Sequence, residues 1–388
     1  MKPRRIIIIT CLLLVACSIF GAASAFETSE SITAASKVYV SGVTFEPAAF
    51  FTGDIGTATV SVTNSNDALS SVVNHASFGD QDIRVISRPY DSTTHLGPHQ
   101  TVPFAFSVRA TGGDGIYSPD FSLSFRDANS LSYRSLVEID NRPLEMTITD
   151  MPDAFAEGKK KTVYLMVSNP RKNDVRNLYL DVSGDGITTT SSRIFIGDLA
   201  HGASVPVNFS ITPYMETTAV LTLNYDNGKN PHTATKNIPV LFGTDKKLAN
   251  PVMNNIEVKS DGAVIHVTGD VNNAGLEIAK SVTVSALSPA VPQDPHKMAV
   301  VGALKPDDFG SFEVTFMADP PITTVPIRIS YKDADGNLYS ATQDVRISSV
   351  GHTVPKTRDT SVLPTIAGIL VLVAFIGGVF LYARKSRK

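Results

Sequence analysis

The strongest constraint on the fold is an internal repeat, which brings the same three landmarks back in the same order. Each copy has a strand-like run that ends in Asn, then a turn containing Gly and Leu, then a hairpin signal rich in Asp, Asn and Gly. Asn64, Asn169 and Asn273 are 105 and 104 positions apart, and Leu96, Leu199 and Leu304 are 103 and 105 positions apart. This register predicts three copies of one structural unit.

Between Ser36 and Ser349, short runs alternate apolar and polar residues and are separated by Gly, Asp, Asn and Pro. This alternation is typical of half-buried β-strands, and no segment of useful length has the helical period. A repeat of this size matches an immunoglobulin-like (Ig-like) sandwich of about seven strands. We therefore predict an all-β ectodomain of three tandem Ig-like β-sandwiches at 36–142, 143–246 and 250–349.

Within these strands, alternate residues should face the sandwich cores. The expected core residues include Val60, Val62, Val163, Leu165, Val167, Val207, Phe209 and Ile211. Two short segments, 141–143 and 245–251, look like linkers between the copies. In the third copy, Gly269 and Asp270 are expected to interrupt the strand that ends at Asn273.

The first 25 residues follow the secretory pattern, with a basic start, an uncharged apolar run from Ile6 to Ala16 and a small-residue site at 23–25. We expect a signal peptide at 1–25. Residues 14–17 also match a bacterial lipobox, which would leave Cys17 lipidated, and this alternative stays open. Because Cys11 and Cys17 are the two cysteines of the chain, cleavage after Ala25 would leave neither disulfides nor thiolate zinc sites.

The opposite end carries the second routing signal. Ile366 to Tyr382 contains no charged residue, and residues 363–383 are long enough to cross about 30 Å of hydrocarbon as a helix. Tyr382 is placed as an interfacial aromatic, and the basic tail 384–388 should stay cytoplasmic through Arg384, Lys385, Arg387 and Lys388. We predict a single-pass anchor in the cell membrane with the ectodomain outside and a short stalk at 350–362.

Within the predicted membrane helix, Gly368, Ala374, Gly377 and Gly378 are small residues. Ala374 and Gly378 are four apart, a spacing that could seat a partner helix, although small residues are common in such helices. Once the signal and the tail are removed, 27 Lys and Arg remain against 37 Asp and Glu, a net charge of −10. An acidic ectodomain argues against nucleic acid as a partner.

Two segments, Gly53–Asn64 and Ile196–Gly202, resemble the repeats of archaeal S-layer-type envelope proteins. Those repeats are similar to the cell-adhesion-related (CARDB-like) Ig-fold modules of prokaryotic surfaces. The resemblance extends over all three copies. It implies an exported, membrane-tethered envelope protein, and some proteins of this kind act beside transport permeases. No catalytic residues come with the family.

The residues that carry chemistry give few candidates. The eight His are scattered, and His95 and His99 are separated by Gly97 and Pro98, so neither suggests a metal site. Asp333, Asp335 and Asn337 resemble the start of a calcium loop, but the same spacing suits a tight hairpin turn, which we favour. Asn208 begins an Asn-Phe-Ser sequon and would face outward from its strand, where a glycan fits.

No nucleophile motif, phosphate loop, cofactor site or small-molecule substrate site is evident, so we predict a protein that is not an enzyme. The leading hypothesis is a structural or adhesive envelope protein, held to membrane lipid by its helix and in contact with an envelope or membrane protein. The alternative is an extracytoplasmic accessory subunit of a membrane transporter of the ABC-permease type.

Overall fold

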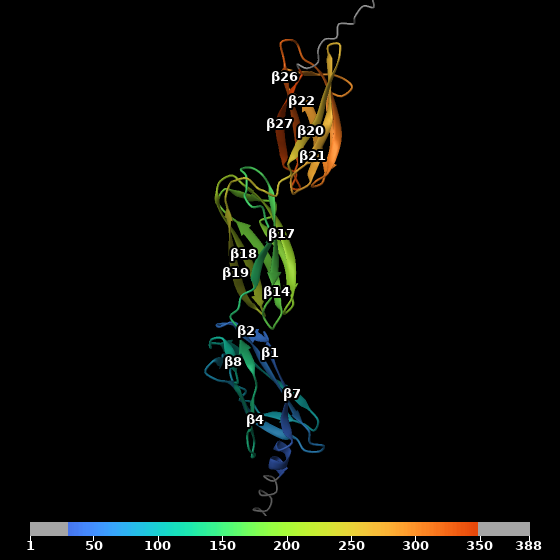
Figure 1. Ribbon diagram of the computed structural model, residues 1–388. Helices are drawn as coiled ribbons and strands as arrows, with labels where there is room; N and C mark the ends of the chain where they lie inside the picture. The colour runs from blue at the N-terminus through green and yellow to red at the C-terminus, as the bar shows by residue number, and fades with distance from the viewer. Residues whose placement is uncertain (1–29, 348–388) are drawn as a thin grey trace, which may run out of the picture. The chain divides into compact units, whose positions relative to one another are not determined.

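The computed structural model describes residues 30–347 (Figure 1). The predicted signal peptide, the stalk, the membrane helix at 363–383 and the basic tail lie outside this range, as do Cys17, Ile366, Gly368, Ala374, Gly377, Gly378 and Tyr382. In the part of the chain that is described, no helix is both long and apolar enough to span a bilayer. Apart from a short helical segment at 30–35, the regular structure is β-strand, as the alternating pattern predicts.

The first repeat comprises β1 to β11 and forms three sheets with the strand orders β1-β3-β7-β5, β10-β9-β4-β6 and β2-β11-β8. All its strand pairs are antiparallel except β11 with β2. Its strands are β1 (Val38–Glu46), β2 (Ala49–Phe50), β3 (Ile55–Asn64), β4 (Ser71–Gly79), β5 (Ile83–Val85), β6 (Thr94–Leu96), β7 (Thr101–Ala110), β8 (Gly115–Tyr117), β9 (Asp120–Phe125), β10 (Leu131–Arg134) and β11 (Val137–Ile139).

The second repeat comprises β12 to β19 in two four-stranded antiparallel sheets, β12-β13-β17-β15 and β16-β14-β18-β19. Its strands are β12 (Glu145–Asp150), β13 (Lys161–Ser168), β14 (Val175–Ser183), β15 (Ile187–Thr189), β16 (Arg193–Leu199), β17 (Ser204–Pro213), β18 (Thr217–Asn227) and β19 (Asn230–Val240).

The third repeat comprises β20 to β27 and has the same strand orders, β20-β21-β25-β23 and β24-β22-β26-β27. Its strands are β20 (Pro251–Asp261), β21 (Val264–Asn273), β22 (Ala279–Ala286), β23 (Val291–Pro292), β24 (Met298–Leu304), β25 (Phe309–Met317), β26 (Thr324–Lys332) and β27 (Leu338–Arg346). Apart from Asp335–Asn337, which fall in the first unit, the chain divides into two compact units between Leu248 and Ala249. The first and second repeats therefore share one unit, and the third repeat is described by itself.

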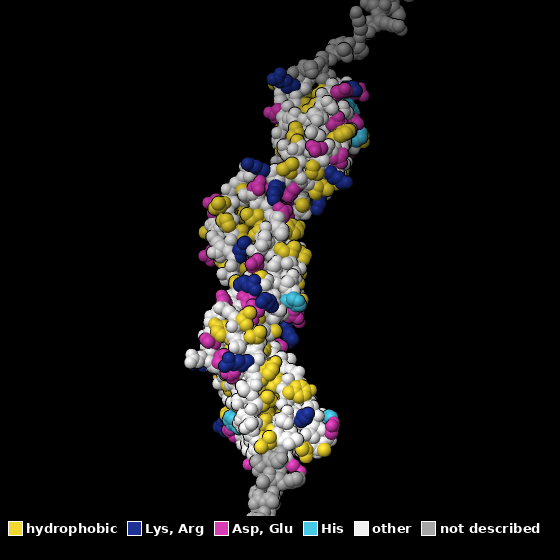
Figure 2. All heavy atoms as spheres, turned by 60° about the horizontal axis from the view of Figure 1, so that its bottom comes forward, with side chains coloured by type: hydrophobic (Ala, Val, Ile, Leu, Met, Phe, Trp, Pro, Cys, Tyr) yellow, Lys and Arg dark blue, Asp and Glu magenta, His cyan; other side chains and the backbone are white. Residues whose placement is uncertain are grey.

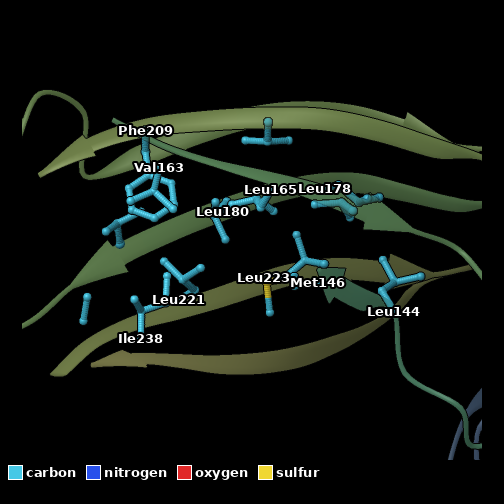
Figure 3. Close-up of a cluster of buried hydrophobic side chains, with 14 of the residues drawn as sticks. Leu144, Met146, Val163, Leu165, Leu178, Leu180, Phe209, Leu221, Leu223 and Ile238 are labelled. Atoms are coloured by element: carbon cyan, nitrogen blue, oxygen red, sulfur yellow. The ribbon is translucent and has the colours of Figure 1, made fainter. Parts of the chain in front are cut away.

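Each repeat buries its own apolar cluster between its sheets. Figure 3 shows the cluster of the second repeat, where side chains from facing strands meet. All eight residues predicted to face a core are buried, at 0–8% exposure. The alternation of apolar and polar residues therefore identified the inward faces correctly, because side chains of a strand point alternately to its two faces.

The three landmark Asn residues tie the two sheets of each repeat together. Asn64 and Asn273 end a strand of one sheet, Asn169 directly follows one, and all three are 0–1% exposed. The Nδ2 of each Asn donates to the carbonyl oxygen of the landmark Leu, which ends a strand of the other sheet. The distances are 3.0 Å from Asn64 to Leu96, 3.1 Å from Asn169 to Leu199 and 3.1 Å from Asn273 to Leu304.

The same Asn side chains also organise the loop that follows. In each repeat Nδ2 also donates to the carbonyl of a residue that lies two positions before the next strand. Oδ1 accepts from the backbone N–H of the residue two positions after the Asn. The second carbonyls belong to Leu69, Asn173 and Glu277, and the N–H donors belong to Asn66, Arg171 and Gly275. One amide group thus satisfies buried polar groups from both sheets, which would be costly to leave unpaired.

The prediction that Gly269 and Asp270 interrupt their strand is wrong. β21 runs without a break to Asn273, and Asp270 pairs with Ser311 in the ladder to β25. A Cβ on Gly269 would lie 3.0 Å from both the Asn254 oxygen and the Phe312 ring, so the glycine makes room for close packing within the sheet. The irregularity lies instead in β20, whose register with β21 shifts between Asn254 and Glu257.

The segments predicted as linkers also hold structure. Asp245, in the second predicted linker, is buried and lies 3.4 Å from the buried Lys161 of β13, measured from Oδ2 to Nζ. In the first predicted linker, Arg142 forms a bidentate ion pair with the buried Asp140. The second segment is therefore packed against β13, and the first is held by an ion pair to a buried residue of the first repeat.

We predict that Asn169→Ala destabilises the second repeat by about 2–4 kcal/mol, because it removes several buried hydrogen bonds and leaves the Leu199 carbonyl unpaired. Hydrogen exchange of the full chain, followed by mass spectrometry, should show faster exchange in β13 and β16. The control is Asn208→Ala, since Asn208 is exposed on β17 of the same repeat. Unchanged protection in Asn169→Ala would contradict the role of the tie.

Candidate functional site at the junction of the first two repeats

The junction within the first compact unit is built around Phe51, which follows β2 of the first repeat. Phe51 is 8% exposed and belongs to the apolar cluster of the second repeat. Its ring stacks on the His232 imidazole of β19 with centroids 3.9 Å apart, and it packs against Tyr225 of β18. An aromatic side chain of one repeat therefore completes the core of the next.

Arg171 covers the other face of the Phe51 ring and reaches into the first repeat. Its guanidinium carbon lies 3.7 Å from the ring centroid, a cation–π contact in a desolvated setting. Its Nη1 donates to the carbonyl oxygens of Asp140 and Arg142, and its Nη2 donates to that of Ala49. Arg171 is 2% exposed, and its buried guanidinium is held by backbone carbonyls and the ring, with the carboxylates of Asp140 and Asp54 nearby.

The second anchor of the junction is the carboxylate of Asp54, whose side chain is 3% exposed. Its Oδ2 accepts from the Asn227 Nδ2 at 2.7 Å and from the Phe51 N–H at 2.9 Å, and its Oδ1 lies 2.8 Å from the His232 Nε2. Asn227 is itself fully buried and also donates to the Ala49 carbonyl. A carboxylate of the first repeat is thus held by an amide and an imidazole of the second.

Asn230, at the start of β19, extends the contact by pairing with the main chain of Ile55. Its Oδ1 accepts from the Ile55 N–H and its Nδ2 donates to the Ile55 carbonyl, both at 2.9 Å. The side-chain amide thereby makes the two hydrogen bonds to Ile55, the first residue of β3, that a neighbouring strand would make. These contacts fix the two repeats through backbone groups as well as side chains.

The electrostatics of the junction follow from burial and pairing. Loss of hydration lowers the pKa of Arg171, although the nearby Asp140 and Asp54 oppose this shift. The hydrogen bonds from Arg142 lower the pKa of Asp140 and keep that carboxylate charged. Burial raises the pKa of Tyr225, so its hydroxyl stays neutral. The buried donors and acceptors of Arg171, Asn227 and Asp54 join the two repeats.

The candidate calcium ligands lie where the hairpin alternative places them. Asp333, Asp335 and Asn337 fall in the turn between β26 and β27, which are antiparallel partners, and Gly336 adopts a φ of +88° there. Asp333 is fully buried. Across residues 30–347, no group of three or more His, Cys, Asp and Glu side chains is arranged to hold a metal ion.

Asn208 is exposed on β17 between the buried Val207 and Phe209, which is the orientation expected from the sequence. The histidines behave differently from isolated surface residues, because six of them lie within 3.5 Å of a carboxylate. These pairs are His75–Asp91, His99–Asp67, His201–Asp174, His232–Asp54, His266–Glu313 and His296–Glu313.

The junction residues were not singled out from the sequence. One signal was available in the repeat itself, because Arg171 occupies the position two residues after the landmark Asn, where the other copies have Asn66 and Gly275. A long cationic side chain at a position that otherwise holds a short one indicates a local contact. The partner of that contact could not be read from the sequence.

Comparison with known proteins identifies no function. No family model matches the chain. An uncharacterized protein of Methanocaldococcus jannaschii, MJ0795, is 25% identical over 268 residues, which are 68% of this chain and 51% of that protein. The chain thus spans about half the length of this relative.

Two solved structures show only slight similarity. A red sea bream transglutaminase is 12% identical with a TM-score of 0.22, covering 53% of this chain and 31% of the enzyme. A protein of unknown function from Porphyromonas gingivalis is 15% identical with a TM-score of 0.20, covering 53% of this chain and all of that one. Neither similarity bears on the activity of this chain.

We predict that the first two repeats unfold in one cooperative transition and that Phe51→Ala separates it into two. Removal of the ring leaves a cavity in the second core and uncovers Arg171, at a cost of about 3–5 kcal/mol. Differential scanning calorimetry of the full chain measures this. The control is Phe195→Ala, because Phe195 is 73% exposed and should change stability little. The same number of transitions in Phe51→Ala as in the wild type, with the third repeat present in both, would contradict the coupling.

We also predict that acid weakens the junction through Asp140. Since its pKa in the folded protein is lowered, its contribution to stability is present above its unfolded pKa of about 3.9 and is lost as the pH falls through the folded value. The melting temperature of Asp140→Asn should therefore depend less on pH below about 4 than that of the wild type. Asp185→Asn, at an exposed residue, should retain the wild-type dependence.

Proposed function

We propose that this protein is a non-enzymatic, membrane-anchored cell-surface protein whose three repeats are tandem Ig-like β-sandwich domains with a structural or adhesive role in the cell envelope. A signal peptide at 1–25 and a helix at 363–383 would place the repeats outside the cell, in contact with membrane lipid through the helix. An envelope or membrane protein would be the partner.

The observation that carries this proposal is the polar junction of the first compact unit. Phe51 enters the core of the second repeat, and Arg171, Asn227 and His232 hold main-chain and carboxylate groups of the first. Two sandwiches joined in this way transmit force and position rather than move freely, because a hinge would leave several buried polar groups unpaired. Stiff spacing is what a surface protein requires to present its outer end.

The tie formed by the landmark Asn supports the same function. Secreted sandwiches commonly use a disulfide between their sheets. Here the inter-sheet connection is an amide that donates to a carbonyl of the opposite sheet, as in Asn169 to Leu199. This connection does not depend on the redox state of the surroundings.

The surface is consistent with a solvated exterior. On the face shown in Figure 2, Lys and Arg side chains are interspersed with Asp and Glu rather than gathered into a patch of one sign. Such a surface favours solubility and gives no preference for a polyanion. The exposed Asn208 would be available for glycosylation.

The proposal predicts that the protein is found in the membrane fraction and that protease added to intact cells digests the repeats but spares the tail. Both signals act through apolar length and flanking charge. Crosslinking in intact cells, followed by detergent extraction, should recover envelope components as neighbours. The matched control is a chain truncated after residue 362, which should be released.

Two results would overturn this proposal in different ways. Recovery of the full chain with residues 1–25 intact in a soluble cytosolic fraction would remove the surface location. Stoichiometric copurification with a permease would retain the location and favour the alternative, an accessory subunit of a transporter.

A further inference from the structure

The third repeat has four edge strands, β20 and β23 in one sheet and β24 and β27 in the other. Proteins protect such edges from pairing with other chains by bulges, charged side chains, Pro and short length. Three of these four edges have such protection. β20 has a register shift and the charged residues Glu257, Lys259 and Asp261. β23 is only two residues long and contains Pro292, and β27 carries Asp344 and Arg346.

β24 has register shifts against β22, but it lacks the charged residues and the Pro that protect the other edges. Its seven residues, Met298 to Leu304, include no charged residue and no Pro. Met298 and Val300 are 56% and 72% exposed. Among the strands of residues 30–347, β22 is the one that pairs with β24, so the outer side of β24 faces no strand. An uncharged apolar edge of this kind is a site for strand addition.

The second repeat shows what protection of this edge looks like. β16 occupies the same position and has the same double register shift, with Gly197 at φ +98° where β24 has Gly302 at φ +100°. Arg193 of β16 lies opposite Asp181, its Nε is 2.7 Å from the Asp181 Oδ1, and its guanidinium covers the Tyr179 ring.

In the third repeat the corresponding cross-strand pairs are uncharged. Met298 lies opposite Ser285, and Val300 lies opposite Thr283. The Arg193–Asp181 ion pair of the second repeat is therefore replaced in the third repeat by Met298 opposite the hydroxyl of Ser285. The same backbone is kept while its protection is lost, so packing within the repeat does not require this change.

The surroundings of β24 continue the apolar surface. Val301 packs directly over Gly310, where an added Cβ would lie 2.6 Å from the Val301 Cγ1. The neighbouring residue, Phe309, is 66% exposed, as is Val291 of β23 at 59%. Met298 and Val300 also line a shallow groove toward Glu313 and Asp270. The edge is thus bordered by exposed apolar residues on one side and by carboxylates farther along the groove.

From these contrasts we infer that β24 is the self-association edge of this protein and pairs antiparallel with β24 of a second copy across a twofold axis. The occupant follows from charge and symmetry. Antiparallel pairing of a strand with itself is closed and self-complementary, and within Met298–Leu304 no like charges come opposite each other because these residues carry no charge. Pairing with β27 of another copy would instead desolvate Asp344 and Arg346.

This inference rests on the proposed function, since it names the partner through which a surface protein would associate laterally. A seven-residue strand pair buries little area and gives weak affinity in dilute solution. Restricting the chains to a membrane surface raises their effective concentration, so association is expected mainly there. A contact of this strength suits an assembly that forms only when many copies share one surface.

Cysteine crosslinking in the full chain tests the inference. In a background with Cys11→Ala and Cys17→Ala, single cysteines are placed at each of positions 298–303, and the purified proteins are oxidised alone and in pairwise mixtures on phosphatidylcholine vesicles. Antiparallel pairing predicts disulfides for pairs whose residue numbers add to one constant, because Cα atoms directly opposite each other are about 4.5–5.5 Å apart. Thr342→Cys on β27 is the matched control edge.

The second part of the experiment introduces a charge into β24. Val300→Lys should lower the yield of the best crosslink by about tenfold, because it places one lysine of each copy within the paired strands. Thr342→Lys, a change at an exposed residue of the other edge, should leave it unchanged. Equal crosslinking at Thr342, a constant difference instead of a constant sum, or indifference to Val300→Lys would overturn the inference.

A failure of membrane anchoring can be distinguished from a failure of β24 to self-associate. Flotation of the vesicles reports whether the full chain binds lipid, independently of any crosslink. If the protein does not float, the same crosslinking at high concentration in solution still reads out the edge. A different protein recovered on β24 in place of the second copy would also overturn the self-association.

Discussion

The hydrogen bond from a buried Asn amide to a Leu carbonyl holds each repeat together at the end where its two sheets meet. Sheets packed face to face are held mainly by non-directional apolar contact, which does not by itself fix how one sheet lies over the other. A buried amide restricts this freedom, because displacement leaves Nδ2 and the carbonyl unpaired. The bond recurs in all three repeats with lengths of 3.0–3.1 Å.

This tie also prepares the junction between the first two repeats. Asn169 closes a tight turn by accepting from the Arg171 N–H, and the turn directs the Arg171 side chain into the first repeat. A buried arginine alone is expensive, since loss of hydration exceeds what one partner returns. Three carbonyls and the Phe51 ring share the compensation. An element that stabilises one repeat thereby positions the contact to the next.

The repeats share a framework and differ where they meet other surfaces. The position two residues after the landmark Asn holds Asn66, Arg171 or Gly275. Of these three residues, Arg171 is the one that makes a contact to another repeat. The edge strand after the second register shift carries an ion pair in β16 and none in β24. Conserving the internal hydrogen bonds while varying exposed positions allows one fold to serve as junction in one copy and as an open edge in another.

The sequence by itself determined the all-β class, the register of the repeat and the inward faces, because alternation and landmark spacing depend on local geometry. It located Asn64, Asn169 and Asn273 without revealing that they bridge two sheets. The strand through Gly269 was missed because the space for Phe312 exists only once β21 and β25 pair. Asp54 meets Asn227 and His232, which lie more than 170 residues further along the chain. Only the tertiary structure decides such contacts, since they depend on how complete repeats pack rather than on neighbours along the chain.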